Sequence, residues 1–299
     1  MEIALEKTNS AEIARALVKA RMAAGSPAMD MVLTLLVVTD EEAVAEALRT
    51  ATTLSREHPS RVIGVILGDG RGGAELNAKV RVGENSSGES ILLRISGELT
   101  KHAESVVLPL LLPDSPVVVW WPGQPPIEPS KDAIGQFAQR RLTDAEATDS
   151  PIRALRAVAR KYAPGDTDLS WTRLTPWRAL LAAALDQSTS KVIRGEVTAG
   201  RNNPAAALLV AWLESRLKVP ITVHRSDTDQ IARVILTTGD GDVCIERISP
   251  TSCHFSVPGS ALRQVPLGAR TLAELLAEDL RRLDADDIYK DTIKHMLAN

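Results

Sequence analysis

Apolar positions in the first half of the chain follow two patterns, helical spacings and continuous runs. Apolar side chains in residues 9–24 recur three and four positions apart, which predicts an amphipathic helix. Residues 31–38, 61–67 and 117–121 form continuous apolar runs rich in β-branched residues, which favours strands buried on both faces. Asp40 is a suitable cap for a helix between the first two runs. Because strands and helices alternate, the sequence predicts a layered α/β fold.

Further elements of the first half are predicted from alternation, caps and prolines. Residues 74–82 alternate between apolar and polar, and with residues 90–95 they predict a hairpin across the Gly/Ser-rich turn at 83–88. Helical spacing or suitable caps predict four more helices, at 98–112, 130–139, 152–162 and 177–185.

The pattern changes near residue 188. A strand at 191–198 and a helix at 204–217 come first, and short strands with turn residues between them follow, at 221–225, 231–237, 242–248, 253–257 and 262–266. Two helices, at 271–283 and 285–297, close the chain. We therefore predict an N-terminal layered α/β domain over residues 1–187 and a second, smaller α+β domain over 188–299.

The overall charge limits the classes of partner. A formal net charge of -3 over 299 residues gives no general attraction to nucleic acid or to a membrane surface, so neither partner is expected. The first residues lack the basic and apolar regions of a secretory signal, which predicts a cytoplasmic protein. Cys244 and Cys253 are expected on adjacent strands, where they could face each other, although buried unreactive thiols are favoured.

Tryptophan is concentrated in two stretches of the chain. The sequence has five Trp, two Tyr and two Phe residues, and four of the Trp residues lie in residues 117–123 and 166–178. An indole is large and carries one N–H donor, so it serves either as a core anchor or as a hot spot of an interface. The residues alone favour packing between sheet and helices and leave a binding surface open.

Two motifs suggest chemistry but fit a structural interpretation better. Gly68–Gly73 matches the dinucleotide fingerprint G-x-G-x-x-G after a strand, yet a strand pattern follows where a helix is required, so an inter-strand loop is favoured. Asp166 and Asp168 could form an acid and base pair, but capping a helix or holding Arg173 or Arg178 is favoured. The five histidines are scattered without a second ligand nearby, so no metal is expected.

Charged residues gather in two further places. The middle segment is locally basic, and its arginines could form a solvated helix face or equally meet an acidic partner or a sugar phosphate: Arg140, Arg141, Arg153, Arg156, Arg160, Lys161, Arg173 and Arg178. The acidic residues from 278 to 287 are expected to form the solvated face of an amphipathic helix pair.

Three stretches resemble a known family. Residues 117–123 (VVVWWPG), 165–178 (GDTDLSWTRLTPWR) and 277–284 (AEDLRRLD) are similar to the glucose-6-phosphate dehydrogenase assembly protein (OpcA) family, most of all to its actinobacterial branch. The likeness runs in order from about residue 30 to about residue 290. It implies a non-catalytic partner that promotes the assembled, active form of glucose-6-phosphate dehydrogenase and so supports the oxidative pentose phosphate pathway and its NADPH, with no cofactor of its own.

The resemblance suggests a set of partner-binding residues around both Trp stretches: Trp120, Trp121, Asp166, Asp168, Trp171, Arg173, Trp177 and Arg178. Within this set we expect Trp171, Arg173, Trp177 and Arg178 to face the partner, because they follow a flexible Pro-Gly-Asp segment. The alternative is a nucleotide- or sugar-phosphate-binding enzyme or sensor, suggested by Gly68–Gly73 and by the arginines near Trp171.

Overall fold

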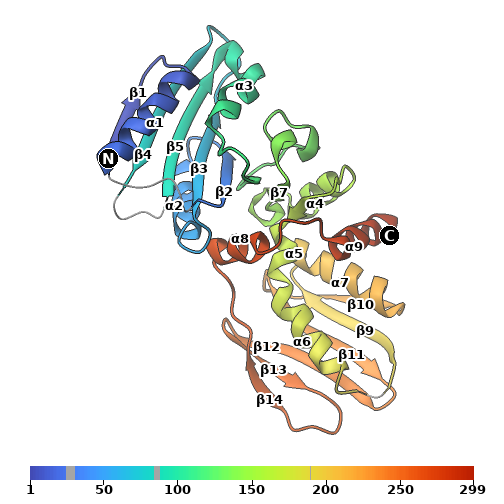
Figure 1. The fold of residues 1–299 in the computed structure, drawn as a ribbon. Helices are drawn as coiled ribbons and strands as arrows, with labels where there is room; N and C mark the ends of the chain where they lie inside the picture. The colour runs from blue at the N-terminus through green and yellow to red at the C-terminus, as the bar shows by residue number, and fades with distance from the viewer. Residues whose placement is uncertain (25–30, 84–87, 189) are drawn as a thin grey trace. The chain divides into compact units, whose positions relative to one another are not determined.

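The computed structural model describes residues 1–24, 31–83, 88–188 and 190–299, which form two compact units (Figure 1). The first unit consists of Met1–Asp144, Lys161–Thr167 and Leu272–Ala285; the second consists of Ala145–Arg160, Asp168–Thr271 and Asp286–Asn299. These bounds differ from the single boundary predicted at residue 187. Residues 145–160 and 168–187 pack within the second unit, and residues 272–285 return to the first.

The first unit is built on an eight-stranded sheet with the strand order β1-β4-β5-β3-β2-β6-β7-β8. Its strands are β1 (Glu2–Leu5), β2 (Leu33–Thr39), β3 (Ser60–Leu67), β4 (Glu75–Val82), β5 (Gly88–Ser96), β6 (Val117–Trp121), β7 (Arg140–Thr143) and β8 (Asp166–Asp168). Strands β5, β3, β2, β6 and β7 pair in parallel, and the predicted layered α/β fold is confirmed. Strands β1 and β4 add an antiparallel edge, and the turn at 84–87 lies outside the described residues.

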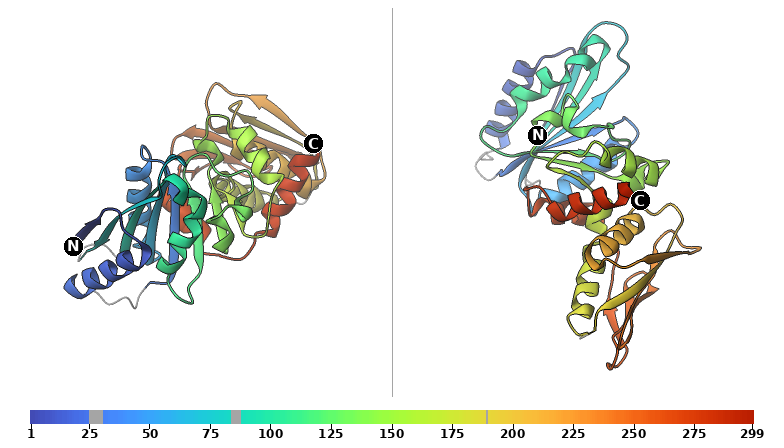
Figure 2. Two further views of the ribbon diagram at one scale, coloured as in Figure 1. Left: turned by 90° about the horizontal axis from the view of Figure 1, so that it is seen from above. Right: turned by 90° about the vertical axis from the view of Figure 1, so that its right-hand side faces the viewer.

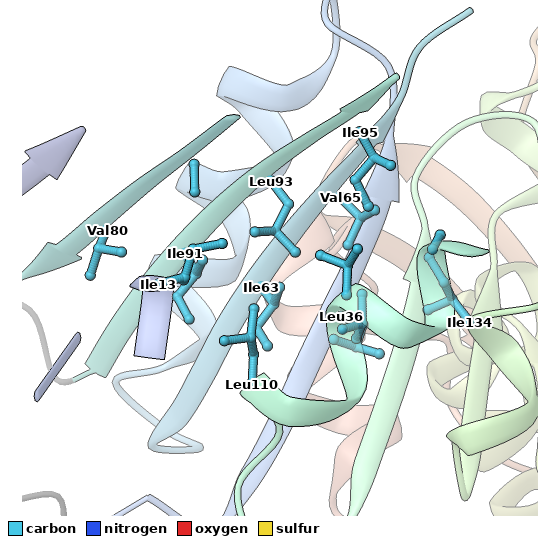
Figure 3. Close-up of a cluster of buried hydrophobic side chains, with 14 of the residues drawn as sticks. Ile13, Leu36, Ile63, Val65, Val80, Ile91, Leu93, Ile95, Leu110 and Ile134 are labelled. Carbon is cyan, nitrogen blue, oxygen red and sulfur yellow. The ribbon is translucent and has the colours of Figure 1, made fainter. Parts of the chain in front are cut away.

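Helices cover both faces of this sheet (Figures 1 and 2). Helices α1 (Ser10–Ala24) and α3 (Ala103–Val107) contribute to the hydrophobic cluster on one face, part of which Figure 3 shows. On the other face α2 (Val44–Leu54) packs against β2 and β3, and α8 (Leu272–Leu280) packs against α2. A Cβ added at Gly64 would lie 3.1 Å from the Leu48 side chain, which shows how tightly α2 lies on β3.

The predicted helix at 98–112 is only partly correct. The segment contains a 3-10 helix at Gly97–His102, the short α3, and a second 3-10 turn at Leu108–Leu110. Pro109 has no backbone N–H and its ring clashes with the preceding turn, so a regular α-helix cannot continue through it.

The predicted helix at 130–139 is wrong. The carboxylate of Asp132 accepts hydrogen bonds from the N–H groups of Ile134 (2.9 Å) and Gly135 (3.0 Å). This local turn competes with helical hydrogen bonding, so only two 3-10 turns form, at Pro129–Lys131 and Gly135–Phe137. Strand β7, which has no local signal in the sequence, then follows directly.

The second unit contains a six-stranded sheet with the order β10-β9-β11-β12-β13-β14. Its strands are β9 (Val192–Ala199), β10 (Ile221–Arg225), β11 (Ile231–Thr238), β12 (Gly241–Ser249), β13 (Ser252–Ser256) and β14 (Arg263–Pro266). The first two run parallel and are joined by helix α7 (Pro204–Leu217), while the remaining pairs are antiparallel. All six strands were predicted, so the α+β character of this part is confirmed.

Five helices belong to the second unit: α4 (Pro151–Ala159), α5 (Leu169–Arg173), α6 (Thr175–Leu185), α7 and α9 (Asp287–Ala298). Helix α7 packs on β9 and β10, α6 packs on β12, and α9 packs on α7 (Figures 1 and 2). Within the ranges that the structure describes, none of the helices has the length and apolar character needed to cross a bilayer.

Replacement of Gly135 by Ala tests the packing around Trp121. A Cβ at Gly135 would lie 2.0 Å from the Pro129 carbonyl oxygen and 3.0 Å from the Trp121 ring. We expect the Gly135→Ala variant to lose about 1–3 kcal/mol of unfolding free energy, measured by denaturant titration. Gly123→Ala is the matched control, because a Cβ added there would meet nothing within 4 Å. Equal stability of the two variants would contradict this account.

Candidate functional site

Helix α5, which carries Trp171, begins at Asp168. One oxygen of the Asp168 carboxylate accepts a hydrogen bond from the Ser170 N–H (2.9 Å), and the other accepts one from the Ala145 N–H (2.9 Å). This carboxylate therefore caps the helix, as favoured from the sequence, and the residue is 2% exposed.

The indole of Trp171 is the centre of a mixed aromatic and charged cluster in the second unit. Its N–H donates to a carboxylate oxygen of Asp286 (2.8 Å), and the guanidinium of Arg178 lies 3.7 Å from the ring centroid. The ring of Tyr289 lies 5.8 Å away, tilted by 49°. Because both the polar edge and the faces of the indole are occupied, this cluster anchors α5, α6 and α9 together.

Asp286 serves two elements at once. Besides the Trp171 indole, it accepts a hydrogen bond from the Tyr289 N–H (2.9 Å) and so caps α9. The sequence pattern predicts a solvated acidic face here, and for this residue that prediction is wrong. Its position before an amphipathic helix was the signal for a cap.

The other residues of the 166–178 stretch are also engaged. Trp177 is 3% exposed, and the guanidinium of Arg247 lies 5.7 Å from its ring centroid. Arg173 forms an ion pair with Glu146 (2.9 Å) and keeps a partly exposed side chain, as does Arg178.

In the first unit, the tryptophans of β6 lie on opposite faces of the sheet. Trp121 belongs to the hydrophobic cluster with α1, whereas Trp120, 0% exposed, points to the other face. The Trp120 indole N–H has no hydrogen-bond partner among the described residues. All four indoles of the two Trp stretches are thus buried, and a partner that binds this conformation cannot reach them directly.

Two buried ion pairs hold β7 in the first unit. Arg141 pairs with Asp166, and Arg140 pairs with Asp279 of α8 (2.7 Å). Burial raises the pKa of Asp166, opposed by its hydrogen bonds from the Ala163 N–H and from Arg141. Asp168 provides the cap that was favoured for one of the two aspartates, whereas Asp166 pairs with Arg141. The expectation that Asp279 is solvated is wrong, because its long-range pairing to β7 buries the carboxylate.

The glycine-rich loop at 68–73 connects strands and begins no helix, as predicted. It leads from β3 to β4, and its backbone packs against the turn after β5: the Gly97 N–H donates to the Asp69 carbonyl (2.8 Å) and the Glu98 N–H to the Gly72 carbonyl (3.3 Å). Gly97 has a positive φ of 63°, and a Cβ there would lie 1.9 Å from the Gly73 carbonyl oxygen.

The glycine-rich loop at 68–73 is not at the position where a doubly wound sheet has its ligand crevice, which is the point where the strand order reverses. The chain proceeds from β2 to β3 on one side and later to β6 on the other side, so the strand order reverses between β2 and β6. The loop after β2 reads Asp40-Glu41-Glu42-Ala43, and the Asp40 carboxylate accepts from the Ala43 N–H (2.8 Å). An acidic loop that satisfies its own helix start fits a dinucleotide phosphate poorly.

The cysteines do not face each other. On the paired strands β12 and β13, Cys244 is opposite Ser256 and Cys253 is opposite Arg247, and both thiols are free. Burial raises the pKa of the Cys253 thiol. In the described part of the chain, no group of three or more His, Cys, Asp or Glu residues could hold a metal ion.

Fold and site together define a two-unit α/β protein whose tryptophan motifs are built into its cores. Residues 51–160 match the family described as the glucose-6-phosphate dehydrogenase subunit N-terminal domain, and residues 164–293 match its C-terminal domain. The chain belongs to this OpcA family of glucose-6-phosphate dehydrogenase subunits. The assignment to its actinobacterial branch stays a prediction.

Two relatives carry the name putative OxPP cycle protein OpcA. The Synechocystis protein is 29% identical over 139 residues, which cover 44% of this chain and 29% of the relative. The Nostoc punctiforme protein is 25% identical over 213 residues, which cover 64% of this chain and 45% of the relative. The matches thus span less than half of the length of either relative.

Among solved structures, a 3-ketoreductase from Actinomadura kijaniata, crystallised with NADP and TDP-benzene, aligns with a TM-score of 0.48. The alignment has 10% sequence identity and covers 88% of this chain and 94% of the reductase. A likeness at this level supports no inference about activity.

The double role of Asp286 leads to a testable expectation. Asp286→Ala removes both the cap of α9 and the partner of the Trp171 indole, so we expect a loss of about 1–3 kcal/mol of unfolding free energy. Asp287→Ala, at an exposed neighbouring position, should change it by about 0.5 kcal/mol or less. Thermal and denaturant unfolding followed by tryptophan fluorescence would measure both variants, and an unchanged Asp286→Ala protein would contradict the anchoring role.

Proposed function

We propose that this protein is a non-catalytic assembly factor and activator of glucose-6-phosphate dehydrogenase, acting in the cytoplasm in support of the oxidative pentose phosphate pathway and NADPH supply. One observation carries the proposal: both domains of the described dehydrogenase subunit match this chain, in order, over residues 51–293. The names of the two relatives, which refer to the OxPP cycle, support the same pathway.

The geometry supports a binding role for exposed residues around the cores. The residues that carry the family resemblance are mostly buried: Trp120, Trp121, Asp166, Asp168, Trp171 and Trp177. We infer that they hold each unit in the shape that the partner recognises. Of the predicted partner-binding set, Arg173 and Arg178 keep partly exposed side chains and are the ones proposed to touch the dehydrogenase.

Activation requires a difference in affinity. A protein that binds two states of an enzyme equally well shifts no equilibrium, however tightly it binds. The proposed activator therefore binds the assembled or substrate-competent dehydrogenase more tightly than the other states. To raise the active fraction from about one half to about nine tenths, it needs about 1.3 kcal/mol of differential binding, close to a tenfold affinity ratio.

Mixing the purified chain with the dehydrogenase of the same organism tests the proposal. We expect a complex on size-exclusion chromatography with light scattering, a shift of the dehydrogenase toward its larger assembly, and a higher rate of NADPH formation at limiting enzyme concentration. The chain alone should form no NADPH from glucose 6-phosphate and NADP. A mixture that shows neither a complex nor any change in assembly or rate would refute the proposal.

The alternative, a nucleotide or sugar-phosphate sensor, predicts that one of these ligands raises the melting temperature of the free chain. The proposed function predicts no change. Because the loop at 68–73 leads into a strand and the loop after β2 is acidic, NADP, ATP and glucose 6-phosphate should leave the melting temperature of the free chain unchanged. Thermal-shift assays at millimolar ligand would measure this. Stabilisation by NADP that is lost in the Gly70→Asp variant would favour the sensor.

A further inference from the structure

A basic hollow lies on the second unit, beside helix α4. It has a volume of about 440 Å³, and we name it the arginine cleft after three of its lining residues, Arg153, Arg156 and Arg160. The remaining lining residues are Asp149, Ser150, Pro151, Ile152 and Asn202. All of these residues belong to the second unit, so the cleft is a feature of that unit alone.

The three arginines form no ion pair with a described residue, although the carboxylate-bearing Asp149 also lines the cleft. They lie at positions i, i+3 and i+7, which places them on one face of α4 and of the residue that ends it. No hydrogen bond or ion pair joins their side chains to a described residue, and Arg153 and Arg160 are exposed. Like charges three or four residues apart on a helix repel each other. Carboxylates supplied by a partner would therefore neutralise the charges of these arginines.

An apolar groove continues from the cleft. It has a volume of about 370 Å³ and shares Ile152 and Arg156 with the cleft. Helix α7 contributes Ala207 and Val210 to it, and the edge strand β10 contributes Val223, whose side chain is 56% exposed. The groove therefore offers uncovered apolar surface directly beside the uncompensated positive charge.

The carboxylate that lines this groove is already hydrogen-bonded within the second unit. Glu214 accepts hydrogen bonds from His295 (3.0 Å) and Asn299 (3.5 Å), so its carboxylate has partners within the unit. Arg201, by contrast, is exposed and adds a further positive charge to the lining. Over the cleft and the groove together, the lining arginines outnumber the two lining carboxylate side chains, Asp149 and Glu214, so a partner meets an excess of positive charge.

We propose that the arginine cleft and the apolar groove together bind an acidic, amphipathic segment of a partner protein. Carboxylates of the segment pair with the three arginines, and its apolar side chains cover Val210 and Val223. This inference rests on the proposed function, in which the partner is glucose-6-phosphate dehydrogenase.

The shape of the surface favours a protein segment over a small phosphorylated ligand. Arg153 and Arg160 are separated by seven residues, about 10 Å along a helix axis, which matches several residues of an extended or helical segment. Small-ligand sites bury about 70–90% of their ligand, whereas the outer arginines of this cleft are exposed. Exposed charges of this kind steer association and tune its salt dependence.

Charge reversal of the cleft tests the inference. The triple variant Arg153→Glu, Arg156→Glu, Arg160→Glu should bind the dehydrogenase about tenfold more weakly or worse at about 0.1 M salt, with a smaller salt dependence. Isothermal titration calorimetry at three salt concentrations would measure both quantities. Val223→Asp, in the groove, should weaken binding in the same direction at every salt concentration.

Matched controls separate a local effect from a general change of charge. Arg15→Glu, Arg49→Glu, Arg282→Glu reverses three exposed arginines of the first unit, and Val18→Asp replaces a valine that is 51% exposed on α1. Both controls should bind within about twofold of the original chain. Far-UV circular dichroism and melting temperature would verify that every variant is folded.

The outcomes distinguish this inference from the function on which it rests. If the unchanged chain does not bind the dehydrogenase, the proposed function fails. If the unchanged chain binds and the folded cleft variants bind equally well, the function stands and the cleft inference is wrong. Glucose 6-phosphate, ATP and inorganic phosphate serve as competitors: binding of any of them that is lost in the triple variant, while dehydrogenase binding is kept, identifies a small-ligand site and also overturns the inference.

Discussion

The buried ion pair between Arg140 and Asp279 is the constraint on which the first unit's architecture depends. Arg140 lies on the short strand β7, and it reaches both the Asp279 carboxylate (2.7 Å) and the Asp284 carbonyl (3.1 Å). A buried pair of this kind adds little net stability, but loss of one partner leaves an uncompensated charge that costs about 3–5 kcal/mol. The pair therefore specifies where the chain returns to the first unit near its C-terminus, more than it strengthens the fold.

The same C-terminal stretch also organises the second unit. Two residues after Asp284, the Asp286 carboxylate receives the Trp171 indole and caps α9. One short stretch of chain thus supplies acidic partners to β7 of the first unit and to the Trp171 cluster of the second. The motifs at 165–178 and 277–284 each carry a buried aspartate, Asp166 or Asp279, that pairs with an arginine of β7.

Local signals in the sequence were sufficient for the regular elements. The apolar runs of β2, β3 and β6 predicted buried strands, and the helix predicted at 204–217 has the bounds that are observed for α7. Predictions failed where one residue changes the local hydrogen bonding, as Asp132 does after Pro129, or where charge is buried by distant partners. Strand β7 begins with two arginines and looks polar, and only pairing with Asp166 and Asp279 makes it a buried strand.

The candidate site shows the same division between local and long-range signals. One of Asp166 and Asp168 was predicted to cap the helix that carries Trp171, because a cap is a local signal, whereas the bond from Trp171 to Asp286 joins residues 115 positions apart. Arginines of one basic segment likewise separate into two kinds: Arg140 and Arg141 are buried and paired, while Arg153, Arg156 and Arg160 form no ion pair within the described chain. The three unpaired arginines are grouped on one face of α4 beside an apolar groove, and this grouping, more than the buried tryptophan motif, is the basis of the proposed partner site.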